Sequence, residues 1–264
     1  MHWLTCPAEQ LFEAYAASMQ KFESGNKRSK AELLTPEFHL YTDRKLSIYY
    51  APLGYVRRKA RVALVGLTPG WQQMELSHRL AAELLADPEI GQNISVVMSE
   101  IKRRMSFAGP MRRNLLQMLD ELDFAQGLGL NSSADIFEDQ ADLVNTTSAL
   151  RYPVFYCDGR SPVGELRNYT GHNPKMLSRD IQVQMVNQIL GQELSQIPQA
   201  LIIPMGEGAS QAIRHLVNIE VVDEARCLFG FPHPSGANGH RHQQFATHRQ
   251  QLKEKLRDWF KIST

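Results

Sequence analysis

Residues 62–70 read Val62-Ala63-Leu64-Val65-Gly66-Leu67-Thr68-Pro69-Gly70. The first four form a short apolar run with branched side chains, which is typical of a strand buried on both faces of a parallel sheet. The run ends in a turn whose glycines allow close backbone approach and whose proline, Pro69, fixes the chain direction. The segment predicts a buried strand followed by a sharp turn into a helix.

Similar runs recur along the chain and alternate with helical patterns. Residues 141–146, 200–203 and 226–230 are further strand candidates, and residues 46–50 form a strand or an extended edge. Apolar residues at helical spacing predict helices near residues 5–22, 76–84, 94–104, 115–119, 181–194, 209–217 and 245–259. Strands that alternate with helices predict a three-layer α/β/α fold around a central, mainly parallel, four-stranded sheet.

Length and composition are those of an ordinary globular protein. The chain has 264 residues, of which 43% are hydrophobic and 22% charged, so it can bury a sizeable core. We expect one domain over residues 1–264, with an N-terminal extension over 1–60 and a helical insertion over 71–105. The region 151–174 is rich in proline and glycine and predicts a long surface loop.

Cysteine usage and hydropathy narrow the class of protein. Cys6, Cys157 and Cys227 are far apart, and no Cys-x-x-Cys pair occurs, so a zinc ribbon or an iron–sulfur cluster is unsupported. Reduced thiols favour a cytoplasmic location. No apolar run is long enough to cross a bilayer, so no membrane partner is expected. The formal net charge of +1 does not by itself indicate a nucleic-acid partner.

Four segments follow the predicted strands and define a candidate site. In an open parallel sheet, ligands bind beyond the carboxyl ends of the strands. We therefore expect Gly66–Gly70, Asn145–Thr147, Pro204–Gly208 and Phe231–Gly236 to converge on one cleft. Taken singly, the first is well explained as a structural turn, and His233 as a packing or capping residue beside prolines.

Taken together and in order, these segments resemble the uracil-DNA glycosylase superfamily. In that family the first motif has the form Gly-x-Asp/Asn-Pro, the last is His-Pro-Ser, and an asparagine between them reads the uracil edge. Here the corresponding stretches are Gly66–Gly70, Leu143–Thr147 and His233–Gly236. Ser106–Pro110 resembles the stretch that carries the base-stacking aromatic residue. The resemblance covers roughly residues 60 to 260.

The resemblance implies a repair enzyme that hydrolyses the N-glycosidic bond of uracil, or a related damaged base, flipped out of single- or double-stranded DNA. Phe107 would stack on the base and Asn145 would read its edge. His233 would stabilise the charge that develops on the leaving base. Gly66, Leu67, Pro69 and Gly70 would shape the pocket, while Ser235 and Gly236 would hold a neighbouring phosphate. This chemistry requires no metal and no cofactor, and it leaves the oligomeric state open.

The chain departs from the family pattern at Thr68, which stands where the family has aspartate or asparagine. A threonine hydroxyl can orient water but cannot act as a base at pH 7. A catalytically weak or inactive DNA-binding module on the same fold is therefore the alternative. A third hypothesis is a hydrolase of nucleotides or small esters, but the chain has neither a Gly-x-Ser-x-Gly elbow nor a glycine-rich phosphate loop.

Two basic clusters flank the proposed site segments. Residues 101–113 hold five basic residues and no acid, and a second cluster at 240–249 combines histidines and arginines. We expect the DNA backbone to be contacted by Lys102, Arg103, Arg104 and Arg241. A solvated helix face is the ordinary explanation of such clusters. His240-x-His242 is a poor metal site, because no carboxylate or cysteine stands nearby at ligand spacing.

Overall fold

The computed structural model describes residues 1–22, 25–157 and 165–262. Contacts divide the chain into two compact units, each assembled from separated stretches. The first unit consists of Met1–Val56, Thr68–Ser106 and Leu150–Leu190, and the second of Arg57–Leu67, Phe107–Ala149 and Gly191–Thr264. We call them the antiparallel unit and the parallel unit, after their sheets. The single domain expected over 1–264 stays a prediction.

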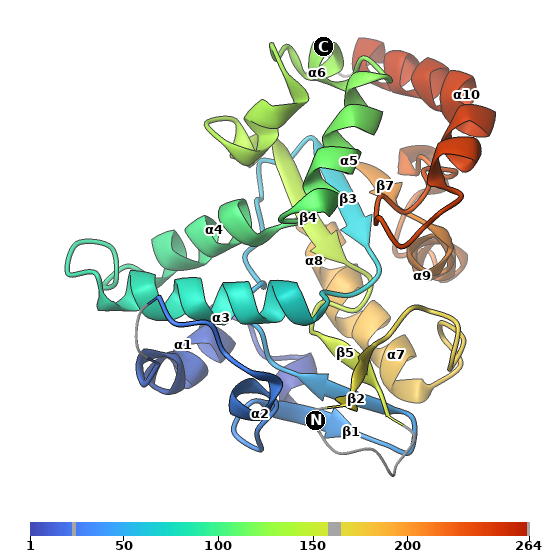
Figure 1. The fold of residues 1–264 in the computed structure, drawn as a ribbon. Helices are drawn as coiled ribbons and strands as arrows, with labels where there is room; N and C mark the ends of the chain where they lie inside the picture. Colours follow the sequence, from blue (N-terminus) through green and yellow to red (C-terminus); the bar gives the residue numbers. More distant parts are fainter. Residues whose placement is uncertain (23–24, 158–164, 263–264) are drawn as a thin grey trace. The chain divides into compact units, whose positions relative to one another are not determined.

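The parallel unit contains the strand from which the sequence analysis began. β3 (Val62–Gly66) lies between β4 (Val144–Ser148) and β7 (Leu201–Pro204), with all strands parallel (Figure 1). Beyond β7, the described residues add only an isolated parallel bridge between Ile202 and Cys227. The mixed α/β character is thus confirmed, but the expected fourth strand is reduced to that one bridge, because a short 3₁₀ helix, η6 (Glu224–Arg226), directly precedes it.

Helices and short turns complete the parallel unit. They are α5 (Pro110–Asp120), α6 (Phe124–Leu128), η2 (Ser133–Phe137), η3 (Ala141–Leu143), α8 (Gly191–Ser195), α9 (Glu207–Asn218) and α10 (Arg241–Ile262). Val62 and Leu64 of β3 belong to one buried cluster with apolar side chains of α5 and α10. Since strand side chains alternate between faces, Ala63 and Val65 point to the opposite side.

The antiparallel unit has a sheet of its own, in the order β1 (His39–Thr42), β2 (Leu46–Tyr49), β5 (Val154–Tyr156) and β6 (Arg167–Asn168). Neighbouring strands in this sheet run antiparallel. The strand expected near residues 46–50 is confirmed. The region 151–174 is not simply a loop, because β5 and β6 lie within it; both strands are too short to give a periodic signal. Residues 158–164 of that region lie outside the described residues.

The antiparallel unit also holds η1 (His2–Leu4), α1 (Ala8–Gln20), α2 (Lys30–Leu33), α3 (Trp71–Ala86), α4 (Ile94–Met105), α7 (Asp180–Met185) and the π-helical segment η5 (Val186–Leu190). α3 packs against both α1 and α4. The two helices expected within 71–105 are confirmed. None of the helices in the described part of the chain is both long and apolar enough to cross a membrane.

A histidine is buried among aromatic rings in the antiparallel unit. The ring of His78 lies edge-on to Phe38, with the ring centres 4.6 Å apart, and its Nε2 is 3.0 Å from the carbonyl oxygen of Tyr50. The side chain is fully buried, and its Nδ1 has no hydrogen-bond partner in the part of the chain that the structure describes. Burial away from water lowers the pKa of His78 to about 4.

This lowered pKa predicts that acid destabilises the fold. The unfolded chain takes up a proton on His78 as the pH falls below about 6.5, whereas the folded chain does so only near pH 4. The protonation of His78 therefore does not reduce the free energy of unfolding well above pH 6.5. Between pH 7.5 and pH 5 this free energy should fall by about 2 kcal/mol. Urea unfolding at several pH values checks this. In His78→Gln most of that loss should disappear, and an unchanged pH dependence in this variant would refute the assignment.

Candidate functional site

The carboxyl end of β3 brings together a glycine, an aromatic ring and a hydroxyl group. A Cβ atom placed on Gly66 would lie 3.2 Å from Cε1 of Phe107 and 3.6 Å from Oγ of Ser148, which ends β4 opposite Gly66. Phe107 has a φ of +52°, a left-handed conformation that costs a non-glycine residue energy and is often found at functional sites. Phe107 is 5% exposed and belongs to the buried core cluster, which leaves little of its surface for the stacking role predicted for it.

His233 lies beyond the carboxyl end of the neighbouring strand, β7. A Cβ atom on Gly206 would be 2.8 Å from Cβ of His233, and Gly206 has a φ of +83°, so this close approach requires glycine. The backbone N–H of Ser235 donates to Nδ1 of His233 at 3.2 Å. Since Nδ1 accepts, the neutral ring carries its proton on Nε2. Burial lowers the pKa of His233, which favours this neutral form.

Two asparagines fix the His-Pro-Ser-Gly segment. Asn114 of α5 donates from Nδ2 to the carbonyl oxygen of Pro234 at 2.8 Å, and Asn238 donates to the carbonyl oxygen of His233 at 3.2 Å. Ser235 is partly exposed, and its Oγ accepts from the N–H of Ala237. Gly236 is exposed. The histidine is therefore held from several directions, while Nε2 has no partner among the described residues.

Asn145 does not lie where a base-reading residue is expected. It is the second residue of β4 and not the last, because the strand starts three residues later than the predicted run and extends to Ser148. Its side chain is fully buried: Oδ1 accepts from the N–H of Arg57 at 3.1 Å, and Nδ2 donates to Glu193 at 2.8 Å. The hydroxyl of Thr147 donates to the other oxygen of Glu193, also at 2.8 Å. Asn145 thus joins β4 to α8.

Thr68 and the turn residues divide between the units. Gly66 and Leu67 belong to the parallel unit, where Leu67 fills the space beside Gly208. Thr68 begins a stretch of the antiparallel unit, in which Pro69 is buried and Gly70 caps α3. The Thr68 hydroxyl donates to the carbonyl oxygen of Tyr152 at 3.0 Å and accepts from the N–H of Val154 at 3.2 Å. Its only proton is engaged, so the hydroxyl anchors the turn to the residues that lead into β5.

This bonding predicts that an aspartate at position 68 destabilises the chain. A carboxylate only accepts hydrogen bonds, so in Thr68→Asp it would face the Tyr152 carbonyl without a donor between them. We expect the free energy of unfolding to fall by roughly 1–3 kcal/mol. Thr68→Ser keeps the hydroxyl and should stay close to the parent. Urea denaturation of both variants measures this, and a Thr68→Asp variant as stable as the parent would show that the hydroxyl is not an anchor.

Most of the residues expected on the DNA backbone are otherwise engaged. Lys102 is only 2% exposed, because it lies on the inner face of α4, so it cannot reach a phosphate from the surface. Arg103 and Arg104 both pair with Glu100, which lies just outside the acid-free window of the sequence. In the second cluster Arg249 pairs with Glu121. Arg241 starts α10 and is partly exposed, which suits the role predicted for it.

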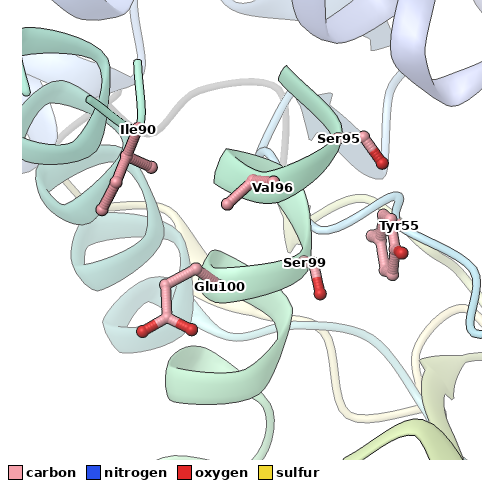
Figure 2. A pocket seen from close by; sticks show the side chains of 6 residues that line it. All are labelled: Tyr55, Ile90, Ser95, Val96, Ser99 and Glu100. Atoms are coloured by element: carbon pink, nitrogen blue, oxygen red, sulfur yellow. The ribbon is translucent and has the colours of Figure 1, made fainter. Parts of the chain in front are cut away.

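A separate pocket lies in the antiparallel unit. Its volume is about 370 Å³, and it is lined by Tyr55, Ile90, Ser95, Val96, Ser99 and Glu100 (Figure 2). Ser95 and Ser99 project from the side of α4 on which Tyr55 lies. None of the residues predicted for the site lines this pocket. In the described ranges no group of three or more histidine, cysteine, aspartate or glutamate side chains is placed to hold a metal ion.

The chain has a relative in Bacillus subtilis. The chain is 34% identical over 233 residues to the uncharacterized protein YoxB of Bacillus subtilis (strain 168), and the match covers 88% of this chain and 87% of that protein. No protein-family model matches the chain. No solved structure matches it either.

Proposed function

We propose that this chain, which belongs to the same family as YoxB of Bacillus subtilis, is a uracil-DNA glycosylase-like enzyme that removes uracil or a related base from DNA. The observation that carries the proposal is His233. It lies beside Gly206, beyond the carboxyl end of β7, its Nδ1 accepts from the N–H of Ser235, and its Nε2–H is left without a partner among the described residues. Such a fixed donor suits a leaving group that becomes negatively charged.

In the proposed reaction the bond between the sugar and the base breaks, and the bonding electron pair goes to the base. Nε2–H of His233 donates to the base oxygen on which the charge grows. Water adds to the sugar carbon, its proton passes to solvent, and the base leaves to take up a proton. Because the only proton of the Thr68 hydroxyl is engaged, no strong base is assigned to the water, and we expect slow turnover.

The partner in this proposal is DNA, and the proposed location is the cytoplasm. Arg241 and the segment containing Ser235 and Gly236 supply the phosphate contacts, which are independent of base sequence. The finer architecture is also proposed: a three-layer α/β/α arrangement whose fourth strand is the segment that bridges to β7 at Cys227.

A second candidate is a DNA-binding module without catalysis. The internal hydrogen bonds of Thr68 favour it, since the position that the resembled family uses to activate water has a structural task here.

One experiment separates the two functions. The protein is incubated in excess with single- and double-stranded oligonucleotides that contain one uracil, and abasic sites are then cleaved with alkali. The same oligonucleotides with thymine serve as controls. Cleavage at the uracil position supports the enzyme. Binding of the strands without any cleavage supports the module, and absence of both contradicts the proposed DNA partner.

A further inference from the structure

Ser148 is a polar side chain that the sequence analysis did not single out. It ends β4, directly opposite Gly66 at the end of β3, and is partly exposed. Its Oγ and the ring edge of Phe107 approach the same point above Gly66, at 3.6 Å and 3.2 Å. The hydroxyl of Ser148 has no hydrogen-bond partner in the part of the chain that the structure describes. An unpaired hydroxyl thus stands beside an aromatic ring, where parallel sheets bind ligands.

The buried neighbours of Ser148 cannot take this role. Asn145 and Thr147 point to the other face of β4, where both are bonded to Glu193. Strand side chains alternate, so Ser148 shares its face with Val144, which belongs to the same buried cluster as Phe107. The hydrogen-bonding group that β4 offers at its carboxyl end is therefore a hydroxyl and not an amide.

We infer that Ser148 reads the edge of the bound base, and that its hydroxyl lets the protein accept bases with either a carbonyl or an amino group at that edge. The inference rests on the proposed function. An amide holds its donor and its acceptor on different atoms, so it suits one edge and leaves groups unpaired against another. A hydroxyl carries one donor and two acceptor positions and rotates. It donates to the O4 carbonyl of uracil or accepts from the N4 amino group of cytosine.

Binding to strands that cannot be cleaved tests this inference without requiring catalysis. The probes are fluorescent single-stranded oligonucleotides in which one position is 2′-fluoro-deoxyuridine, 2′-fluoro-deoxycytidine or a tetrahydrofuran abasic analogue. Fluorescence anisotropy gives the Kd of each for the parent, for Ser148→Ala and for Ser195→Ala. Ser195 is an exposed serine at the end of α8 whose hydroxyl donates to the carbonyl oxygen of Gln192, and it serves as the matched control.

The parent should bind both base-containing strands more tightly than the abasic strand, with Kd values for uracil and cytosine within about threefold of each other. Ser148→Ala should weaken binding of both strands about fivefold, which corresponds to the loss of one hydrogen bond, and should leave the abasic strand unaffected. Ser195→Ala should match the parent. Circular dichroism confirms that each variant is folded.

Several results would overturn the inference. Ser148→Ala binding equal to the parent removes the role of Ser148, and a loss confined to one base removes the tolerance of both edges. A parent that binds the abasic strand as tightly as the others shows that no base is read. These outcomes are distinct from failure of the proposed function, which shows as uncleaved uracil strands in the alkali assay.

Discussion

Replacing His233 with alanine is expected to slow uracil excision about a hundredfold or more. The variant loses a donor whose position is fixed by the Ser235 N–H at Nδ1 and by close packing against Gly206. Because the loss falls on a charge that develops only as the bond breaks, the rate should fall while DNA binding changes little. Single-turnover excision with excess protein, together with the Kd for the uracil strand, measures both effects.

A histidine outside the proposed site provides the control. His172 is exposed in the antiparallel unit, and His172→Ala should excise uracil at the parent rate. If His233→Ala is as fast as the parent, the role assigned to His233 is wrong for any substrate. If the variant instead loses binding and rate in equal measure, His233 holds the DNA and does not stabilise the leaving base.

Replacing Glu193 with alanine is expected to lower the free energy of unfolding by roughly 3 kcal/mol or more. Glu193 is 1% exposed, and its two oxygens accept from Asn145 and Thr147 at 2.8 Å each. Without the carboxylate, both donors lose a buried acceptor, and the missing side chain leaves a cavity. Urea denaturation followed by circular dichroism measures the loss.

Two further variants calibrate this result. Glu193→Gln keeps the volume and one acceptor oxygen, so it should lose clearly less stability than Glu193→Ala. Glu207→Ala removes an exposed glutamate of α9 that bonds to Gln211 and should change stability by no more than about 0.5 kcal/mol. A Glu193→Ala variant as stable as Glu207→Ala would show that the network does not hold β4 to α8, and would reopen a ligand-binding role for Asn145.

Elements with a long or wholly apolar pattern could be predicted from the sequence. The run at 62–65 is β3 and the run at 200–203 is β7 within one residue, because a strand buried on both faces must be apolar throughout. The antiparallel sheet was harder to predict. β5 and β6 are three and two residues long, and the pairing of β5 with β2 joins residues more than a hundred positions apart, which no local pattern encodes.

The candidate site shows the same division. Gly206 and His233 each follow a run predicted to be a parallel strand. The carboxyl ends of such strands share one edge of the sheet, so the closeness of the two residues could be expected from the sequence. The position of Asn145 could not be obtained in that way, since a shift of three residues in the strand start moves a side chain from the strand end to its beginning. Ser148 had no sequence signal, because a serine after a strand is common.

Charge was the least predictable feature. Lys102 was predicted to lie on a basic surface, but it is buried on the inner face of α4. Its neighbours Arg103 and Arg104 form salt bridges with Glu100. The sequence window 101–113 leaves out Glu100 at its edge, so the positive charge counted within it overstates the local charge. Glu193 carried no sequence signal, although it is buried and bonds to Asn145 and Thr147.

The proposed activity is tested most directly by the release of free base from DNA. An oligonucleotide carrying one ring-labelled uracil is incubated with excess protein, and free uracil is separated from the strand and counted against alkali-sensitive sites. We expect free uracil to appear in a single phase, with one abasic site for each molecule released. Label that stays wholly in the strand, while the protein demonstrably binds that strand, would contradict the proposed N-glycosidic bond hydrolysis.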